Sequence, residues 1–101
     1  MRFRATVTSL RRTPITGRYR PHIVFDFSTT LFGLTQLDDV EWPFAPGETK
    51  PGRVTMLGHA DFKPVVQAIA PGVRFSLLEG THEVARGVID AVEERTLDLD
   101  G

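Results

Sequence analysis

The sequence predicts an all-β domain in which five or six short antiparallel strands form a small barrel or sandwich. Two observations indicate this fold class. Apolar and polar residues alternate at a period of two in several segments, as they do in strands with one buried face. Glycine and proline, which occur 9 and 7 times, separate these segments at short intervals.

Two strands are predicted in the first third of the chain. Residues Phe3–Thr8 alternate between apolar and polar side chains. Residues His22–Phe27 are mainly β-branched and aromatic, which strands favour. In this second strand the apolar residues Ile23, Phe25 and Phe27 are expected to share one face.

The segments on either side of the second strand are predicted to be loops. Residues 11–21 hold two prolines, a glycine and four arginines, which is typical of an exposed loop. Residues Leu34–Trp42 allow a short strand, but the prolines and glycines up to Gly52 prevent a longer one. Trp42 and Phe44 are expected to form either a lid over the core or an exposed anchor for a partner, and the lid is favoured.

The second half of the chain contains further strand patterns. Residues Arg53–Ala60 resume the alternation, whereas Val65–Ala70 is apolar, short and ambiguous. Residues Val73–Leu78 and Val84–Val92 predict a final hairpin around a turn at Glu79–His82.

No helix is predicted. Residues Glu83–Arg95 have a composition that a helix allows, but their β-branched residues and Gly87 favour a bent strand. A chain of 101 residues is too short for two well-buried cores, so residues 1–95 are expected to form a single domain. Residues 96–101 are expected to form an acidic, disordered tail.

The net charge of −1 conceals an uneven distribution. Half of the 12 basic residues are arginines that precede the first acid, Asp26, and acidic residues gather near the C-terminus. This polarity either orients a docking partner or reflects two solvated ends. The chain has no cysteine, which excludes a disulfide framework, and no apolar run of the roughly 18–20 residues that span a bilayer. We therefore expect a cytoplasmic protein without membrane contact.

The loop over residues 11–21 is the main candidate for a binding site. Guanidinium groups bind phosphate or carboxylate in a bidentate manner, and a tyrosine ring can stack on a nucleic-acid base. The alternative is that these residues only shape the loop, because basic loops alone discriminate weakly between partners. The candidate residues are Arg11, Arg12, Arg18, Tyr19 and Arg20.

No pattern nominates a catalytic site. Residues Gly47–Gly52 have the glycine spacing of a phosphate-binding loop, but Arg53 and Val54 replace its lysine and hydroxyl residue. The histidines His22, His59 and His82 are too scattered in the sequence to predict a metal site. We therefore expect a binding protein rather than an enzyme, with no metal and no cofactor.

Two groups of residues lie about 60 positions apart in the sequence. They are Arg12-Thr13-Pro14 with Tyr19-Arg20-Pro21, and Gly72-Val73-Arg74-Phe75 with Glu79-Gly80 and Gly87-Val88-Ile89. Together with Pro51-Gly52 and Lys63-Pro64, they resemble the third, C-terminal β-barrel domain of bacterial elongation factor Tu. The resemblance covers Phe3 to about Val92 and implies a six-stranded antiparallel Greek-key barrel. The GTPase site of that factor lies in a different domain, which has no counterpart in this sequence.

The resemblance also implies partners, because in the elongation factor this barrel contacts tRNA, a nucleotide-exchange factor and the neighbouring domains. Lys63 matches a phosphate-contacting lysine, Glu79 matches a glutamate that tunes tRNA affinity, and His22 replaces a glutamine of the same contact set. Two arginines of the family's last hairpin are missing at Leu78–Glu83, and an acid is gained there.

This loss weakens the expectation of tRNA binding, since phosphate neutralisation dominates such affinity. The expected function is therefore a protein-interaction role linked to translation. Direct RNA binding through the basic loop and Lys63 is the alternative. A second copy of the chain could instead cover the surface that the family buries against its other domains, so a homodimer is also considered.

Overall fold

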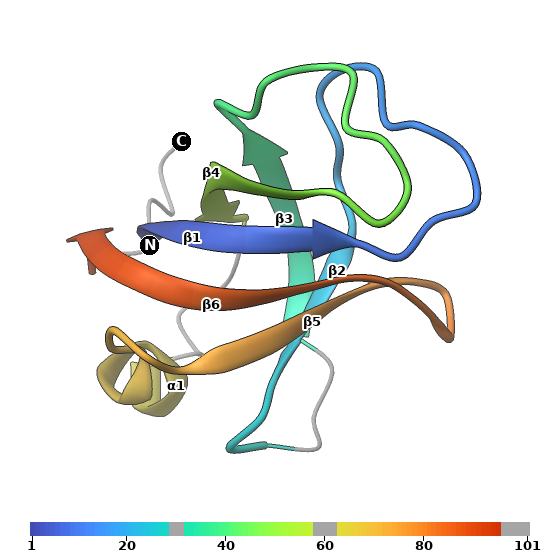
Figure 1. Cartoon of the computed structure of the whole chain (residues 1–101). Helices are drawn as coiled ribbons and strands as arrows, with labels where there is room; N and C mark the ends of the chain where they lie inside the picture. The colour runs from blue at the N-terminus through green and yellow to red at the C-terminus, as the bar shows by residue number, and fades with distance from the viewer. Residues whose placement is uncertain (29–31, 58–62, 96–101) are drawn as a thin grey trace.

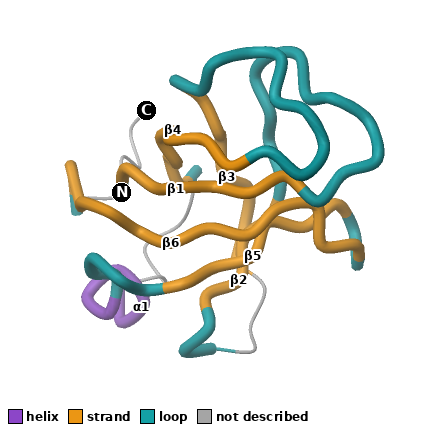
Figure 2. Tube along the Cα trace, viewed as in Figure 1, coloured by secondary structure: helices purple, strands orange, loops and turns teal. Residues whose placement is uncertain are grey.

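The computed structural model describes residues 1–28, 32–57 and 63–95, and Figure 1 traces them from the N-terminus to the C-terminus. In chain order the elements are β1 (Arg2–Ser9), β2 (His22–Phe25), β3 (Phe32–Asp38), β4 (Thr49–Met56), α1 (Lys63–Ala68), β5 (Arg74–Glu79) and β6 (His82–Glu94). All of these elements except α1 are strands, and α1 lies at one end of the molecule (Figure 2).

The strands form a closed barrel in the order β1-β4-β3-β2-β5-β6, and every neighbouring pair is antiparallel. Strands β2, β3 and β4 follow one another as a meander, and β1 lies beside β4, which is the Greek-key arrangement. The pairing of β6 with β1 closes the barrel, so the sheet has no free edge strand. The predicted six-stranded antiparallel Greek-key barrel is thus confirmed.

An aromatic cluster occupies the centre of the barrel. The rings of Phe3 and Phe75 meet edge-on with their centroids 5.5 Å apart, and Phe25 lies 6.4 Å from Phe3 and 6.5 Å from Phe75. All three side chains are buried because the alternation in β1, β2 and β5 turns them inward. Tilted and edge-on ring pairs of this kind stabilise the core beyond the area they bury.

The two glycines of the last hairpin lie where a side chain is disfavoured. Gly80 adopts a φ of 62° in the turn between β5 and β6, a conformation that disfavours residues with a side chain. Gly87 lies directly opposite Phe75 in the β5–β6 pairing. A Cβ atom at Gly87 would lie 2.2 Å from Cζ of Phe75, so the close approach of the ring requires glycine.

The prediction that the chain contains no helix is wrong, because α1 begins at Lys63 and extends into the ambiguous apolar segment Val65–Ala70. Val66 and Ile69 turn to the same side and are buried against the barrel. Nη1 of Arg95 donates hydrogen bonds to the carbonyl oxygens of Val66 at 3.0 Å and Ile69 at 2.7 Å, which satisfies the end of the helix. This cap comes from a residue far along the chain, so no local pattern indicates it.

No helix in the described part of the chain has the length and apolar character needed to cross a bilayer.

Several strand boundaries differ from the prediction. Strand β2 ends at Phe25, and the ring of Phe27 instead stacks on that of Phe25 at 5.3 Å while 43% of the residue stays exposed. Strand β3 ends at Asp38 because the next residue, Asp39, takes a φ of 55° and turns the chain away. Strand β4 spans Thr49–Met56 and so begins before the predicted first residue, Arg53. Residues 58–62 and the predicted tail at 96–101 lie outside the described residues.

The loops that follow β1 and β3 lie side by side at one end of the barrel (Figure 1). The amide of Ile15 donates to the carbonyl of Phe44 at 2.9 Å, and the amide of Phe44 donates back at 2.7 Å. Ile15 and Phe44 are buried, and Trp42 is partly buried against the core. The lid interpretation of Trp42 and Phe44 is therefore confirmed, whereas the loop at 11–21 is only partly exposed.

Candidate functional site

Residues 11–21, which we call the arginine loop, connect β1 to β2 and are tied to β3 by their backbone. The amide of Leu37 donates to the carbonyl of Tyr19 at 2.8 Å. Further along, the carbonyl of Pro21 accepts hydrogen bonds from the amide of Thr35 at 2.9 Å and from its hydroxyl at 2.8 Å. With the pairing of Ile15 described above, these contacts hold the loop in one conformation against the barrel.

Arg11 and Tyr19 are occupied by contacts within the protein. The guanidinium carbon of Arg11 lies 5.4 Å from the centre of the Tyr19 ring, a cation–π arrangement. Nε of Arg11 lies 3.9 Å from Oε2 of Glu79, and Nη2 donates to the hydroxyl of Thr13 at 3.2 Å. Arg11, Tyr19 and Glu79 thus form one cluster between the arginine loop and the end of β5.

The phenol of Tyr19 is part of this cluster and stays neutral. Its oxygen is buried and has no hydrogen-bond partner among the described residues. Burial, followed by the neighbouring Glu79 carboxylate, raises the pKa of Tyr19 above its ordinary value of 10.0. A nucleic-acid base could stack on the ring face that Arg11 covers only after Arg11 had moved away.

Arg12, Arg18 and Arg20 have the opposite character. All three are exposed, and within the described ranges none of them has an ion-pair or hydrogen-bond partner. Their guanidinium groups are therefore free to bind a ligand or a partner. Because hydrogen bonds hold the backbone of the loop against the barrel, the three side chains project from a backbone that is held in place.

The remaining predicted residues lie in different places. His22 begins β2 directly after the arginine loop and is partly exposed. Lys63 begins α1, and its side chain lies outside the described part of the structure. The cap from Arg95 places α1 at the C-terminal end of β6, whereas the hydrogen bond from Leu10 to Val84 places the arginine loop near its beginning (Figure 1). The structure therefore brings Arg11, Tyr19 and Glu79 together but separates α1 from them.

A groove of about 560 Å³ runs between the arginine loop and the β5–β6 hairpin. Leu10, 42% exposed, and Val84 contribute apolar surface to the lining. Arg12, Glu79 and His82 contribute charged or polar groups. No sequence motif indicated this groove, because it forms only where the chain after β1 is hydrogen-bonded to the hairpin.

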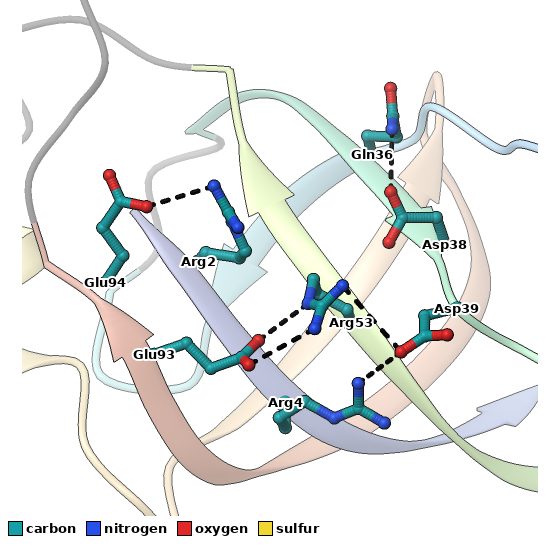
Figure 3. Close-up of polar contacts among 8 residues, drawn as sticks. All are labelled: Arg2, Arg4, Gln36, Asp38, Asp39, Arg53, Glu93 and Glu94. Atoms are coloured by element: carbon teal, nitrogen blue, oxygen red, sulfur yellow. Dashed lines mark hydrogen bonds and ion pairs between the residues drawn. The ribbon is translucent and has the colours of Figure 1, made fainter.

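The basic start of the chain pairs with its acidic end (Figure 3). Strands β1 and β6 are antiparallel neighbours, so Nη2 of Arg2 reaches Oε2 of Glu94 at 3.1 Å. Arg53 of β4 binds Glu93 through two hydrogen bonds, at 2.8 and 3.3 Å. On this face the basic residues near the N-terminus and the acidic residues near the C-terminus thus neutralise one another. The unpaired arginines of the arginine loop are not neutralised in this way.

Asp39 joins the same network through Arg4 and Arg53. Oδ2 of Asp39 accepts a hydrogen bond from Nη1 of Arg4 and lies 3.9 Å from Nη1 of Arg53 (Figure 3). The hydrogen bond from Arg4 lowers the pKa of Asp39 below its ordinary 3.8, and that from Arg53 lowers the pKa of Glu93 below its ordinary 4.5. The charged forms of both carboxylates therefore stabilise the folded state.

This network predicts a loss of stability in acid. Groups whose pKa is lower in the folded state stabilise it above their unfolded pKa, and this contribution disappears as the pH falls through the folded value. The urea midpoint should therefore stay level above about pH 5 and fall below about pH 4.5, with a small amplitude because the pairs are exposed. In the variant Asp39→Asn/Glu93→Gln the fall should be shallower. An identical fall in this variant and in the wild type would contradict the assignment.

The described ranges contain no group of three His, Cys, Asp or Glu side chains placed to hold a metal ion. Comparison with models of known protein families and with curated proteins found no match to this chain. Its function is therefore inferred from its own residues.

Proposed function

We propose that this protein is a non-catalytic binding module whose arginine loop binds an acidic surface of a protein partner. The observation that carries the proposal is the exposure of Arg12, Arg18 and Arg20, which lack partners within the described residues. Guanidinium groups match carboxylates in geometry and can bind them through paired hydrogen bonds. The tied backbone of the loop reduces the conformational entropy lost on binding.

The groove beside the arginine loop supports a protein partner. Protein interfaces combine an apolar centre with a polar rim in which arginine is enriched. Leu10 and Val84 supply apolar surface in this groove, and Arg12 lines it from the loop. An acidic segment carrying one apolar side chain fits this combination.

The resemblance to the third domain of elongation factor Tu leads us to place the partner in the translation machinery. Thr13-Pro14 and Tyr19-Arg20-Pro21, which carry part of that resemblance, belong to the arginine loop. The proposed interface and the residues that carry the resemblance thus share one segment.

RNA is the second candidate, because free guanidinium groups also bind phosphate. Two features favour the protein partner over it. Arg11 covers a face of the Tyr19 ring that a base would need, and α1, which begins at Lys63, lies at the other end of β6. A continuous path for a phosphate backbone would have to bridge that separation.

The proposal is tested with the variant Arg12→Gln/Arg18→Gln/Arg20→Gln. Immobilised wild-type protein should retain a protein partner from the native lysate after ribonuclease treatment, and the partner should then be purified. Its affinity for the triple variant should fall about tenfold or more, equivalent to about 1.4 kcal/mol, because the carboxylates lose their cationic partners. The replaced side chains have no hydrogen-bond or ion-pair partner within the described residues, so thermal unfolding should be unchanged.

Arg74→Gln is the matched control, since Arg74 is another exposed arginine without a partner among the described residues and lies at the opposite end of β5 from Glu79. It should bind the partner as the wild type does. Capture that disappears with ribonuclease would favour the RNA alternative. Equal affinity of the triple variant and the wild type would exclude the arginine loop as the interface.

A further inference from the structure

The outer face of the barrel carries a hollow of about 470 Å³ where β2, β5, β6 and β1 lie side by side, and we call it the outer-face pocket. Its volume falls within the range of small-molecule sites, roughly 300–1,000 Å³. Exposed side chains of Thr6, Arg74 and Arg86 line it, Phe25 and Phe75 of the aromatic cluster also belong to the lining, and no residue of the arginine loop does. None of the residues predicted from the sequence to bind RNA or a partner lines it.

The strand registers place the lining side chains in two rows across the sheet. One row is Thr8, Arg86, Ser76 and Val24, and the other is Thr6, Val88, Arg74 and Asp26. The rows combine apolar surface with hydroxyl groups and two guanidinium groups. Phe25 and Phe75 add apolar surface to that of Val24 and Val88. Apolar surface combined with a few polar groups is typical of sites that bind small organic molecules.

Arg74 differs from every other arginine on the strands. Arg2, Arg4, Arg53 and Arg86 all form ion pairs with carboxylates. Arg74 is exposed, and within residues 1–28, 32–57 and 63–95 it has no ion-pair partner, although Asp26 lines the same pocket. Among the described strand arginines, Arg74 is thus the one without an ion pair, and it lies at the outer-face pocket.

The second arginine of the pocket is already occupied. Nε and Nη2 of Arg86 contact Oε1 of Glu83 at 3.0 and 2.9 Å. The carboxylate of Glu83 also accepts a hydrogen bond from the hydroxyl of Ser76. Arg86 therefore adds little net positive charge, and Arg74 is the group that would bind an anion.

We propose that the outer-face pocket binds a small organic molecule that joins one carboxylate to an apolar body. The carboxylate pairs with the guanidinium of Arg74, and the apolar body lies along Val24 and Val88. Asp26 lines the same pocket and repels a second negative charge, so the site favours a monoanion over a phosphate dianion. This site is independent of the proposed partner interface on the arginine loop.

The test uses 3-phenylpropanoate as the probe and its neutral isostere 3-phenylpropanamide as the matched ligand. Titration of the ¹⁵N-labelled protein should give saturable amide shifts at Val24, Ser76 and Val88 with the carboxylate, at a Kd on the order of 1 mM for so small a ligand. The amide should bind at least tenfold more weakly, because it lacks the charge that pairs with Arg74.

Variants separate the pocket from general charge effects. Arg74→Gln should raise the Kd at least tenfold, whereas Arg20→Gln, which removes an exposed arginine of the arginine loop, should leave it unchanged. Asp26→Asn should lower the Kd, because a repelling charge is removed. The spectrum of each free variant verifies its fold.

Equal binding of the carboxylate and the amide would overturn the proposal, as would an unchanged Kd in Arg74→Gln. A higher Kd in Asp26→Asn than in the wild type would also overturn it. So would the absence of a saturable shift in the wild type up to about 20 mM probe, which is about twenty times the expected Kd. The variant Arg12→Gln/Arg18→Gln/Arg20→Gln should bind the probe with the wild-type Kd. The tests of the pocket and of the partner interface can therefore succeed or fail independently of each other.

Discussion

Replacing Phe3 by alanine is expected to lower the free energy of unfolding by about 3–5 kcal/mol. The side chain is fully buried and contacts the rings of Phe25 and Phe75 at the centre of the barrel. The smaller side chain removes this apolar burial and leaves a cavity that the closed sheet cannot collapse to fill. Urea unfolding followed by tryptophan fluorescence measures the change.

Phe27→Ala is the control for this prediction. Phe27 stacks on Phe25, but 43% of the residue is exposed. Its replacement should cost about 1 kcal/mol, because little cavity forms at a half-exposed site. A loss at Phe3 no greater than the loss at Phe27 would contradict the view that the aromatic cluster holds the barrel together.

Gly87→Ala is the second substitution for which a large effect is expected, about 1–3 kcal/mol or more. The new Cβ would lie 2.2 Å from Cζ and 2.8 Å from both Cε atoms of the Phe75 ring. Phe75 is itself buried against Phe3 and Phe25, so the ring cannot move aside without disturbing the core. Thermal or urea unfolding of the variant measures the loss.

A double-mutant cycle isolates the contact between these two residues. In a Phe75→Leu background the ring is absent, so Gly87→Ala should cost clearly less than it does in the wild type. Gly17→Ala is the matched control, since no atom lies within 4 Å of a Cβ at that position and it should change stability by less than about 0.5 kcal/mol. Equal costs of Gly87→Ala in both backgrounds would show that the ring is not the cause.

The strands and the last hairpin were predictable because their signals are local. Alternation in Phe3–Thr8 depends on neighbouring positions, and the turn depends on the permissive backbone of Gly80. The helix α1 was not predictable in the same way. It has 6 residues, too few for a strong periodic pattern, and its last carbonyls are held by Arg95 from beyond β6.

The candidate site was predictable only as a segment. Arginine content singled out the arginine loop, but it did not separate Arg11 from Arg12, which are adjacent in the sequence. Arg11 is held by Tyr19 and Glu79, whereas Arg12 is exposed and has no partner among the described residues. That difference depends on the end of β5, which lies more than sixty positions further along the chain.

The sequence by itself determined the all-β class, the hairpin and the basic loop, because side-chain alternation, turn residues and local charge act between near neighbours. Only the tertiary structure decided which charges remain free. Arg2 and Glu94 are 92 positions apart and still form an ion pair, because barrel closure places β1 beside β6. Arg74 forms no ion pair within the described residues, although the strand register places Asp26 in the same row of side chains. Both binding sites proposed for this barrel therefore depend on which charges folding leaves unpaired.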